Sequence, residues 1–211
     1  MKLQTFPIGT YGANCYVLTD EKSGETAVID PAWLTDELKK AVDSAAFVKY
    51  IFLTHGHFDH ICGVFDLHAY TGAPVAIHEA DADCLFDEKK SHANESEYTF
   101  KPVHADILLN EGDVFSLGGS SITVMHTPGH TKGGVCFVCE PDRMIFSGDT
   151  LFRSTVGRTD FEGGSTREMA ESIERLRHLD GDYDVYPGHS RSTTLQHERE
   201  RNFFIRRLGR I

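Results

Sequence analysis

Residues 54–60 place four potential metal ligands directly after a strongly apolar segment. Residues 48–53, Val-Lys-Tyr-Ile-Phe-Leu, have the composition of a buried strand, and Thr-His-Gly-His-Phe-Asp-His follows at once. Protonated imidazoles packed this closely would repel one another. A divalent cation displaces the protons and supplies the balancing charge. The feature therefore predicts a fold in which a buried strand ends at a metal site.

Three further candidate ligand sites follow other predicted strands. They are His126-Thr127-Pro128-Gly129-His130, Ser147-Gly148-Asp149 and Tyr186-Pro187-Gly188-His189. Loops held by rigid strands commonly carry site residues. Pro128 and Gly129 exclude a helix between His126 and His130, so the two need not bind one ion, and His130 is the better candidate. These additional sites disfavour the alternative that residues 54–60 are only a polar turn rich in histidine.

Size and charge restrict the class of protein. A chain of 211 residues predicts a single domain over 1–211, and 40% hydrophobic with 25% charged residues is typical of a soluble globular protein. The net charge of −11 argues against nucleic acid as a partner. No stretch resembles a signal peptide or a membrane span, and five cysteines, an odd number, suggest free thiols. We expect a cytoplasmic protein without a membrane partner; a homo-oligomer stays open.

Short strands and helices alternate along the chain. The pattern predicts strands over 3–6, 14–19, 26–30, 48–53, 75–78, 114–117, 121–126, 134–139, 144–147 and 184–186, and helices over 35–46, 61–70, 166–179 and 194–208. Two halves of this kind favour two sheets packed face to face and covered outside by helices. Residues 87–106 are polar and weakly patterned, which predicts a surface loop or lid.

Several other residues are given structural roles. Cys136 and Cys139 are three apart on a predicted strand, so they face opposite sides and are interpreted as core residues rather than a metal pair. The remaining histidines lack ligand spacing and are predicted to lie on the surface or on helices: His68, His78, His92, His104, His178 and His197. The arginine-rich end is interpreted as an amphipathic closing helix, with substrate binding as the alternative: Arg199, Arg201, Arg206, Arg207 and Arg210.

The motifs together resemble those of metallo-β-lactamase-fold hydrolases of the glyoxalase II type, in its short single-domain branch. They occur in the family's order over nearly the whole chain: Thr-His-Gly-His-Phe-Asp-His at 54–60, Thr-Pro-Gly-His at 127–130, Gly-Asp-Thr-Leu-Phe at 148–152 and Tyr-Pro-Gly-His at 186–189. The resemblance implies an α/β fold with four layers, an αββα sandwich.

The resemblance also implies a ligand set of five histidines and two aspartates. His55, His57 and His130 would hold one metal, Asp59, His60 and His189 would hold a second, and Asp149 would bridge them. Two divalent metals are thus expected, zinc first, with iron or manganese as alternatives, because nitrogen and oxygen ligands suit all three. Lactamases of this fold commonly carry a cysteine in place of Asp149 and lack the equivalent of His60.

The chemistry expected from such a site is hydrolysis of a small acyl thioester or ester. Two cations would lower the pKa of a bridging water from 15.7 to about 7, giving hydroxide at neutral pH. Asp59 would orient that nucleophile and accept its proton. Asp30, at the end of a predicted strand, would fix a ligand histidine; capping the turn at Pro31 is the alternative.

The substrate is less constrained than the reaction. Arg153 and Arg158 follow the bridging carboxylate, where a guanidinium could orient a substrate carboxylate; the alternative for Arg158 is an ion pair with Asp160 that fixes the loop. Only residues 190–211 follow His189, so we expect no counterpart of the carboxy-terminal glutathione-binding domain of glyoxalase II proper, which argues against a glutathione thioester as the substrate.

Two alternative functions stay open. The Gly-Arg-Thr-Asp sequence at 157–160 also resembles persulfide dioxygenases, which hold one iron through the equivalents of His55, His130 and Asp149. A non-catalytic metal-binding protein is the other alternative, disfavoured because the ligand set is complete.

Overall fold

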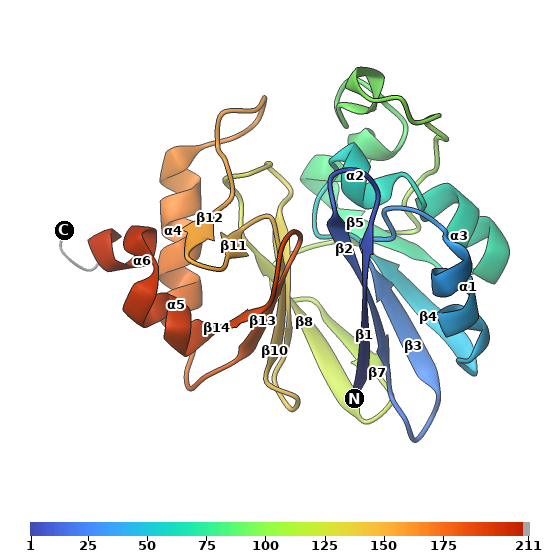
Figure 1. The fold of residues 1–211 in the computed structure, drawn as a ribbon, viewed down its shortest axis with the longest axis horizontal. Coiled ribbons are helices and arrows are strands. Elements are labelled where there is room, and N and C mark those ends of the chain that lie inside the picture. Colours follow the sequence, from blue (N-terminus) through green and yellow to red (C-terminus); the bar gives the residue numbers. More distant parts are fainter. Residues whose placement is uncertain (209–211) are drawn as a thin grey trace.

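Two six-stranded sheets face each other in the computed structural model, which describes residues 1–208 (Figure 1). The first sheet has the order β1 (Lys2–Ile8), β2 (Ala13–Thr19), β3 (Glu25–Ile29), β4 (Phe47–Phe52), β5 (Val75–His78), β6 (Ile107–Leu109). The second has the order β14 (Thr193–Thr194), β13 (Asp184–Pro187), β10 (Met144–Gly148), β9 (Val135–Cys139), β8 (Ser120–His126), β7 (Val114–Leu117). A hairpin of β11 (Leu151–Phe152) and β12 (Thr155–Val156) follows β10.

Helices cover the outer faces of both sheets (Figure 1). On the first sheet they are α1 (Asp36–Asp43) and α3 (Val64–Thr71), and beside the second they are α4 (Thr166–Arg177), α5 (Leu195–Arg201) and α6 (Phe203–Leu208). The short helix α2 (Phe58–Ile61) and two 3₁₀ helices, η1 (Glu79–Leu85) and η2 (Ala93–Glu95), lie in the loops. The predicted αββα sandwich is confirmed.

The central core forms between the two sheets. Phe52 of β4 packs against Phe137 of β9 with ring centroids 4.9 Å apart, and both side chains are fully buried. Cys139 joins this core, whereas Cys136 packs in the cluster beneath α4. The prediction that the two thiols face opposite sides of a strand is therefore confirmed, because strand side chains alternate.

The structure corrects two predicted helices. The helix expected over 61–70 is broken between α2 and α3, because Gly63 donates its amide hydrogen to the carbonyl of Pro31 at 2.9 Å and a Cβ there would lie 2.4 Å from that oxygen. The helix expected over 194–208 is broken at Asn202, whose backbone is extended and whose Oδ1 accepts the amide hydrogen of Phe204.

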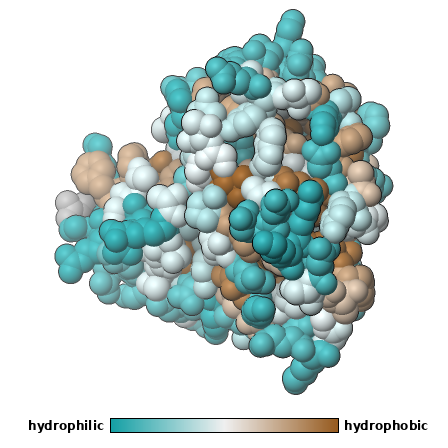
Figure 2. Space-filling view, turned by 45° about the vertical axis from the view of Figure 1, so that its right-hand side comes forward, coloured by the Kyte–Doolittle hydropathy of each residue, from teal (hydrophilic) through white to brown (hydrophobic). Residues whose placement is uncertain are grey.

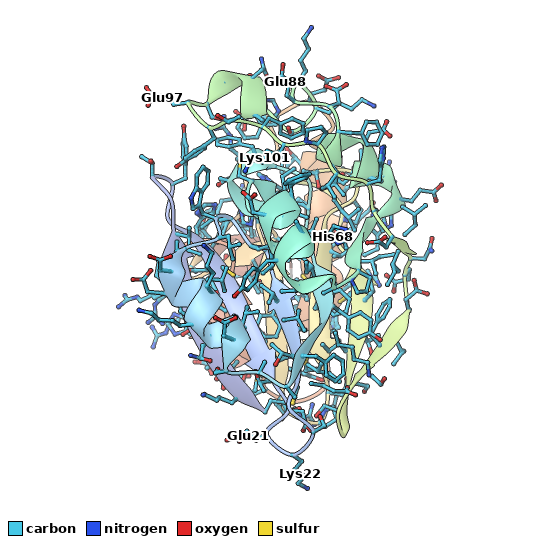
Figure 3. All side chains as sticks on the ribbon, turned by 90° about the vertical axis from the view of Figure 1, so that its right-hand side faces the viewer. Glu21, Lys22, His68, Glu88, Glu97 and Lys101 are labelled. Carbon is cyan, nitrogen blue, oxygen red and sulfur yellow. The ribbon has the colours of Figure 1, made fainter. Side chains whose placement is uncertain are left out.

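Residues 87–106 fold over the end of the molecule that carries α2. Figure 3 shows Glu88 and Glu97 at the outer tip of this segment, far from Glu21 and Lys22 at the other end. The segment is anchored at several points: Lys101 pairs with Asp66 of α3 at 2.8 Å, and the backbone of Phe58 donates to the carbonyl of Ser91 at 2.9 Å. It is thus an ordered cover rather than a free loop.

The visible surface is mainly hydrophilic, with hydrophobic residues in separate patches (Figure 2). Within residues 1–208, no helix combines the length and the hydrophobicity needed to cross a membrane.

Candidate metal centre

The predicted ligands come together where four strands end. The loop after β4 carries His55 and His57 and continues into α2, which carries Asp59 and His60; His130 follows β8, Asp149 follows β10 and His189 follows β13. In Figure 1, α2 lies at the upper end of the two sheets. Both sheets therefore contribute ligands, and the packing between them determines how far apart the ligands lie.

Three overlapping groups of side chains have the spacing of metal ligands. Within each group the potential ligand atoms lie within 4.8 Å of one another: His55, His57 and His130; His55, His60 and Asp149; Asp59, His60 and His189. These groups contain all seven side chains predicted from the sequence, and nitrogen and carboxylate ligands of this kind suit a divalent cation.

Asp149 lies between the groups. Its Oδ2 is 3.5 Å from His130 Nε2 and 3.6 Å from His189 Nε2, and its Oδ1 is 3.5 Å from His60 Nε2. Gly188 makes this approach possible, because a Cβ at that position would lie 2.2 Å from Asp149 Oδ1. A carboxylate in this position can face two cations at once.

Oxygen acceptors fix the orientation of three histidine rings. The Nδ1 of His60 lies 3.0 Å from Asp30 Oδ2, that of His130 lies 2.8 Å from the Arg158 carbonyl, and that of His189 lies 3.1 Å from the Tyr11 carbonyl. Because a carbonyl only accepts, His130 and His189 must donate through Nδ1, which leaves their Nε2 lone pairs facing the centre. A neutral ring with its lone pair inward is the form that binds metal.

Two buried atoms at the centre have no hydrogen-bond partner: His55 Nε2 and Asp149 Oδ1. Leaving a buried polar atom unpaired costs about 1–3 kcal/mol, so such atoms call for an explanation. In addition, His60 Nε2 and His189 Nε2 approach to 3.3 Å with both outer nitrogens bound to oxygen acceptors. A divalent cation among these atoms accounts for both features, and the residues present fit one.

The protonation tendencies agree with this arrangement. Burial, and then the neighbouring histidines, lower the pKa of His57 to about 3, and burial lowers the pKa of His55 well below its usual value. Burial opposes the charge on His60, but Asp59, Asp149 and Asp30 outweigh it and raise its pKa to about 10. The raised pKa of His60 reflects the negative charge of the three carboxylates that face it.

Asp30 contacts the centre through His60. Its side chain is buried, and it accepts hydrogen bonds from the backbone and hydroxyl of Thr54 at 2.7 and 2.6 Å, besides facing His60. It adopts φ +51°, a left-handed conformation uncommon for a residue other than glycine. The contact with a candidate ligand histidine is the one expected from the sequence, and the carboxylate is directed to Thr54 and His60 rather than to the turn at Pro31.

A cavity of about 470 Å³ opens onto the ligands. Five candidate ligand side chains and four aromatic side chains line it, together with four other residues: His57, Asp59, His130, Asp149 and His189; Tyr11, Phe58, Phe152 and Phe161; His92, Thr155, Val156 and Arg158. His92, predicted to lie on the surface or on a helix, directly precedes η2, and its side chain is 20% exposed within this cavity. The segment 87–106 brings its ring to a centroid distance of 5.4 Å from that of His57.

The two arginines proposed for substrate binding differ in position. Arg158 lines the cavity, and its Cζ lies 3.9 Å from the ring centroid of Phe161. It also pairs with the carboxylate of Asp160, through Nε at 2.6 Å and through Nη2 at 2.7 Å. Arg153 is half-buried and does not line that cavity. The predicted ion pair with Asp160 is present.

The other singled-out residues lie away from the ligands. His68 lies on α3 (Figure 3) and faces the carbonyl of Ala73 at 2.9 Å, and His126 stacks on His78. Arg199 donates to backbone carbonyls at 177, 179 and 181, so it has a structural role. The exposed arginines at 201, 206 and 207 line a separate pocket together with Phe203, and Arg210 lies outside the described residues.

Comparison with known proteins assigns the fold to a family. The model of the metallo-beta-lactamase superfamily matches residues 8–189. An uncharacterized protein of Mycobacterium leprae is 36% identical over 99% of this chain and 100% of its own length. Hydroxyacylglutathione hydrolase GloC of Haemophilus influenzae is 28% identical over 97% of this chain and 98% of its own.

Solved structures agree with that assignment. BLEG-1, a B3 metallo-beta-lactamase, has a TM-score of 0.88 at 30% identity and covers 97% of this chain and 99% of its own. TTHA1623, determined in a di-iron-bound form, has a TM-score of 0.83 at 30% identity and covers 95% and 99%. ETHE1 of Myxococcus xanthus has a TM-score of 0.80 at 24% identity, covers 99% and 90%, and shows the shared fold alone.

Proposed function

The chain belongs to the metallo-beta-lactamase superfamily, and on that premise we propose that it is a dinuclear metal-dependent hydrolase of acyl thioesters or related activated esters. The observation that carries the proposal is the convergence of six predicted ligands around a seventh, Asp149, with two buried polar atoms left unpaired. Similarity to a hydroxyacylglutathione hydrolase over nearly the whole chain supports the thioester.

In this proposal, His55, His57 and His130 would hold one ion, Asp59, His60 and His189 would hold a second, and Asp149 would be available to both. We propose zinc as the metal, with iron or manganese as alternatives; the di-iron form of TTHA1623 makes iron a specific competitor. Bound cations of this kind supply a water acidic enough to act as hydroxide near neutral pH and polarise the substrate carbonyl.

The chain's own residues have defined tasks in this proposal. Asp59 lines the cavity and faces His189 Nε2 at 3.2 Å, where it can orient the attacking water and accept its proton. Burial raises its pKa, but His60 and His189 outweigh that effect and hold the pKa below its usual range, so the carboxylate is ionised. Tyr11, Phe58 and Phe161 exclude water from the apolar part of the substrate.

Arg158 is proposed to bind a carboxylate of the substrate, because it is the one arginine or lysine that lines the cavity within residues 1–208. Asp160 holds two of its nitrogens and leaves the remaining one for a ligand. We expect Arg158→Ala to raise KM for a substrate with a carboxylate about tenfold, the usual effect of one charge-assisted hydrogen bond, with little change in kcat. A neutral ester substrate is the control, and an equal rise in KM for both substrates would contradict this role.

The proposed activity is tested by assaying protein purified without chelator. S-D-lactoylglutathione is the thioester probe, and a chromogenic β-lactam is the comparison because of the similarity to BLEG-1. We expect thioester turnover that a chelator abolishes and added zinc restores. Oxygen uptake on glutathione persulfide by iron-loaded protein, without thioester turnover, would instead support the mononuclear dioxygenase.

A further inference from the structure

A buried carboxylate outside the ligand set connects the two loops that carry His57 and His130. Asp81, in η1, is only 3% exposed. Its Oδ2 accepts the amide hydrogen of Gly56 at 3.0 Å and the hydroxyl hydrogen of Thr131 at 2.7 Å, and its Oδ1 accepts the amide hydrogen of Gly133 at 2.6 Å. The carboxylate thus receives three hydrogen bonds, all from these two loops.

The donors are immediate neighbours of candidate ligands. Gly56 lies between His55 and His57, and Thr131 follows His130 directly. One loop leaves β4 of the first sheet and the other joins β8 to β9 of the second. Asp81 therefore links a loop of the first sheet to a loop of the second. The link lies beside the centre, where His57 Nδ1 and His130 Nε2 are 2.9 Å apart.

The packing around Asp81 leaves no space for a side chain at position 56 or 133. A Cβ on Gly133 would lie 2.6–2.7 Å from atoms of Asp81, and a Cβ on Gly56 would lie 2.5 Å from Cys84 and 3.2 Å from the Asp81 carbonyl. Both glycines let the loop backbones come within hydrogen-bonding distance of η1. A well-packed and fully hydrogen-bonded support of this kind keeps ligands within fractions of an ångström.

We infer that Asp81 is a positioning residue that sets the separation of His57 from His130 and thereby the affinity of the ion held by His55, His57 and His130. The inference rests on the proposed metal-dependent function. Asp81 belongs to none of the candidate ligand groups and does not line the cavity, so it would act through the backbone of Gly56 and through Thr131 and Gly133. Within residues 1–208 the carboxylate of Asp81 accepts hydrogen bonds from Gly56, Thr131 and Gly133, none of which adjoins Asp59, His60 or His189, so we expect the effect to be confined to one ion.

The test is titration of metal-free protein with cobalt(II), followed by absorption and calorimetry. Asp81→Asn keeps the size of the side chain but turns an NH₂ group toward hydrogen-bond donors. We expect it to weaken one of two binding steps about 10–100-fold, the usual range for residues that support ligands, and to leave the other unchanged. The matched control is Asp83→Asn, an exposed aspartate two residues away that pairs with Lys90.

Two further variants assign the effect. In His189→Ala protein, where the step for the group of His55, His57 and His130 remains, Asp81→Asn should still weaken binding. If Asp81→Asn fails to fold, Thr131→Val, which removes one of the three hydrogen bonds, should show a smaller loss in the same step. Melting temperatures of the metal-free proteins identify any general loss of stability.

Two results would overturn the role of Asp81: binding by Asp81→Asn equal to that of Asp83→Asn, or an equal loss at both steps. If the wild type itself fails to bind two ions, the proposed function fails, and the inference with it. If the wild type binds two ions but Asp81→Asn does not differ from it, only the inference fails.

Discussion

Replacing Asp149 with alanine should remove both metals and reduce thioester hydrolysis by about a thousandfold or more. Asp149 lies 3.5 Å from His60 and His130 and 3.6 Å from His189, so its carboxylate is placed to serve both proposed ions. Loss of the charge that faces both cations removes several kcal/mol of stabilisation from the reaction, and each 1.36 kcal/mol corresponds to about a factor of ten. Elemental analysis and steady-state kinetics measure the two effects.

The control for this variant is Asp36→Ala, which removes an aspartate 85% exposed on α1. It should keep two metals and full activity. Retention of one tightly bound metal by Asp149→Ala, with activity reduced only severalfold, would contradict a shared position for this carboxylate.

Replacing Asp59 with asparagine should lower kcat by about 10²–10⁴-fold, the usual contribution of a general base, while the fold is retained. The side chain is only 17% exposed, but an amide of the same shape can fill its place beside His189. The amide cannot accept a proton, so kcat should fall more than KM rises. Thermal unfolding and circular dichroism check the fold.

Metal analysis separates the two roles proposed for Asp59. A variant that keeps the wild-type metal content but loses activity supports proton transfer by this carboxylate. Unchanged kcat with full metal content would exclude Asp59 as the base.

The sequence predicted the main strands well, and the candidate ligands that it named lie together in the structure, for a physical reason. The strand β10 is an apolar run buried except at Met144, and Asp149 follows it directly, whereas the loops after β4, β8 and β13 carry the other candidate ligands. Strands of two or three residues, β6, β11, β12 and β14, were not predicted, because they are too short to show a periodic pattern.

Residues that tertiary folding brings to the site had no sequence signal. In the sequence, His92 has no second candidate ligand at a metal-binding spacing. It reaches the cavity only because the segment 87–106 is anchored over α2. Asp81 lies in an ordinary acidic stretch, and its contacts with Gly56 and Gly133 depend on how the two sheets pack. Contacts between distant segments are the part of a site that single-sequence patterns do not record.

Metal stoichiometry of the wild type and of His189→Ala tests the dinuclear centre most directly. His189 belongs to the group of Asp59, His60 and His189, which shares no side chain with the group of His55, His57 and His130. We therefore predict two divalent metals per chain in the wild type and one in His189→Ala, measured by elemental analysis on protein purified without chelator. One metal in the wild type, unchanged in His189→Ala, would contradict a dinuclear centre and favour a mononuclear one.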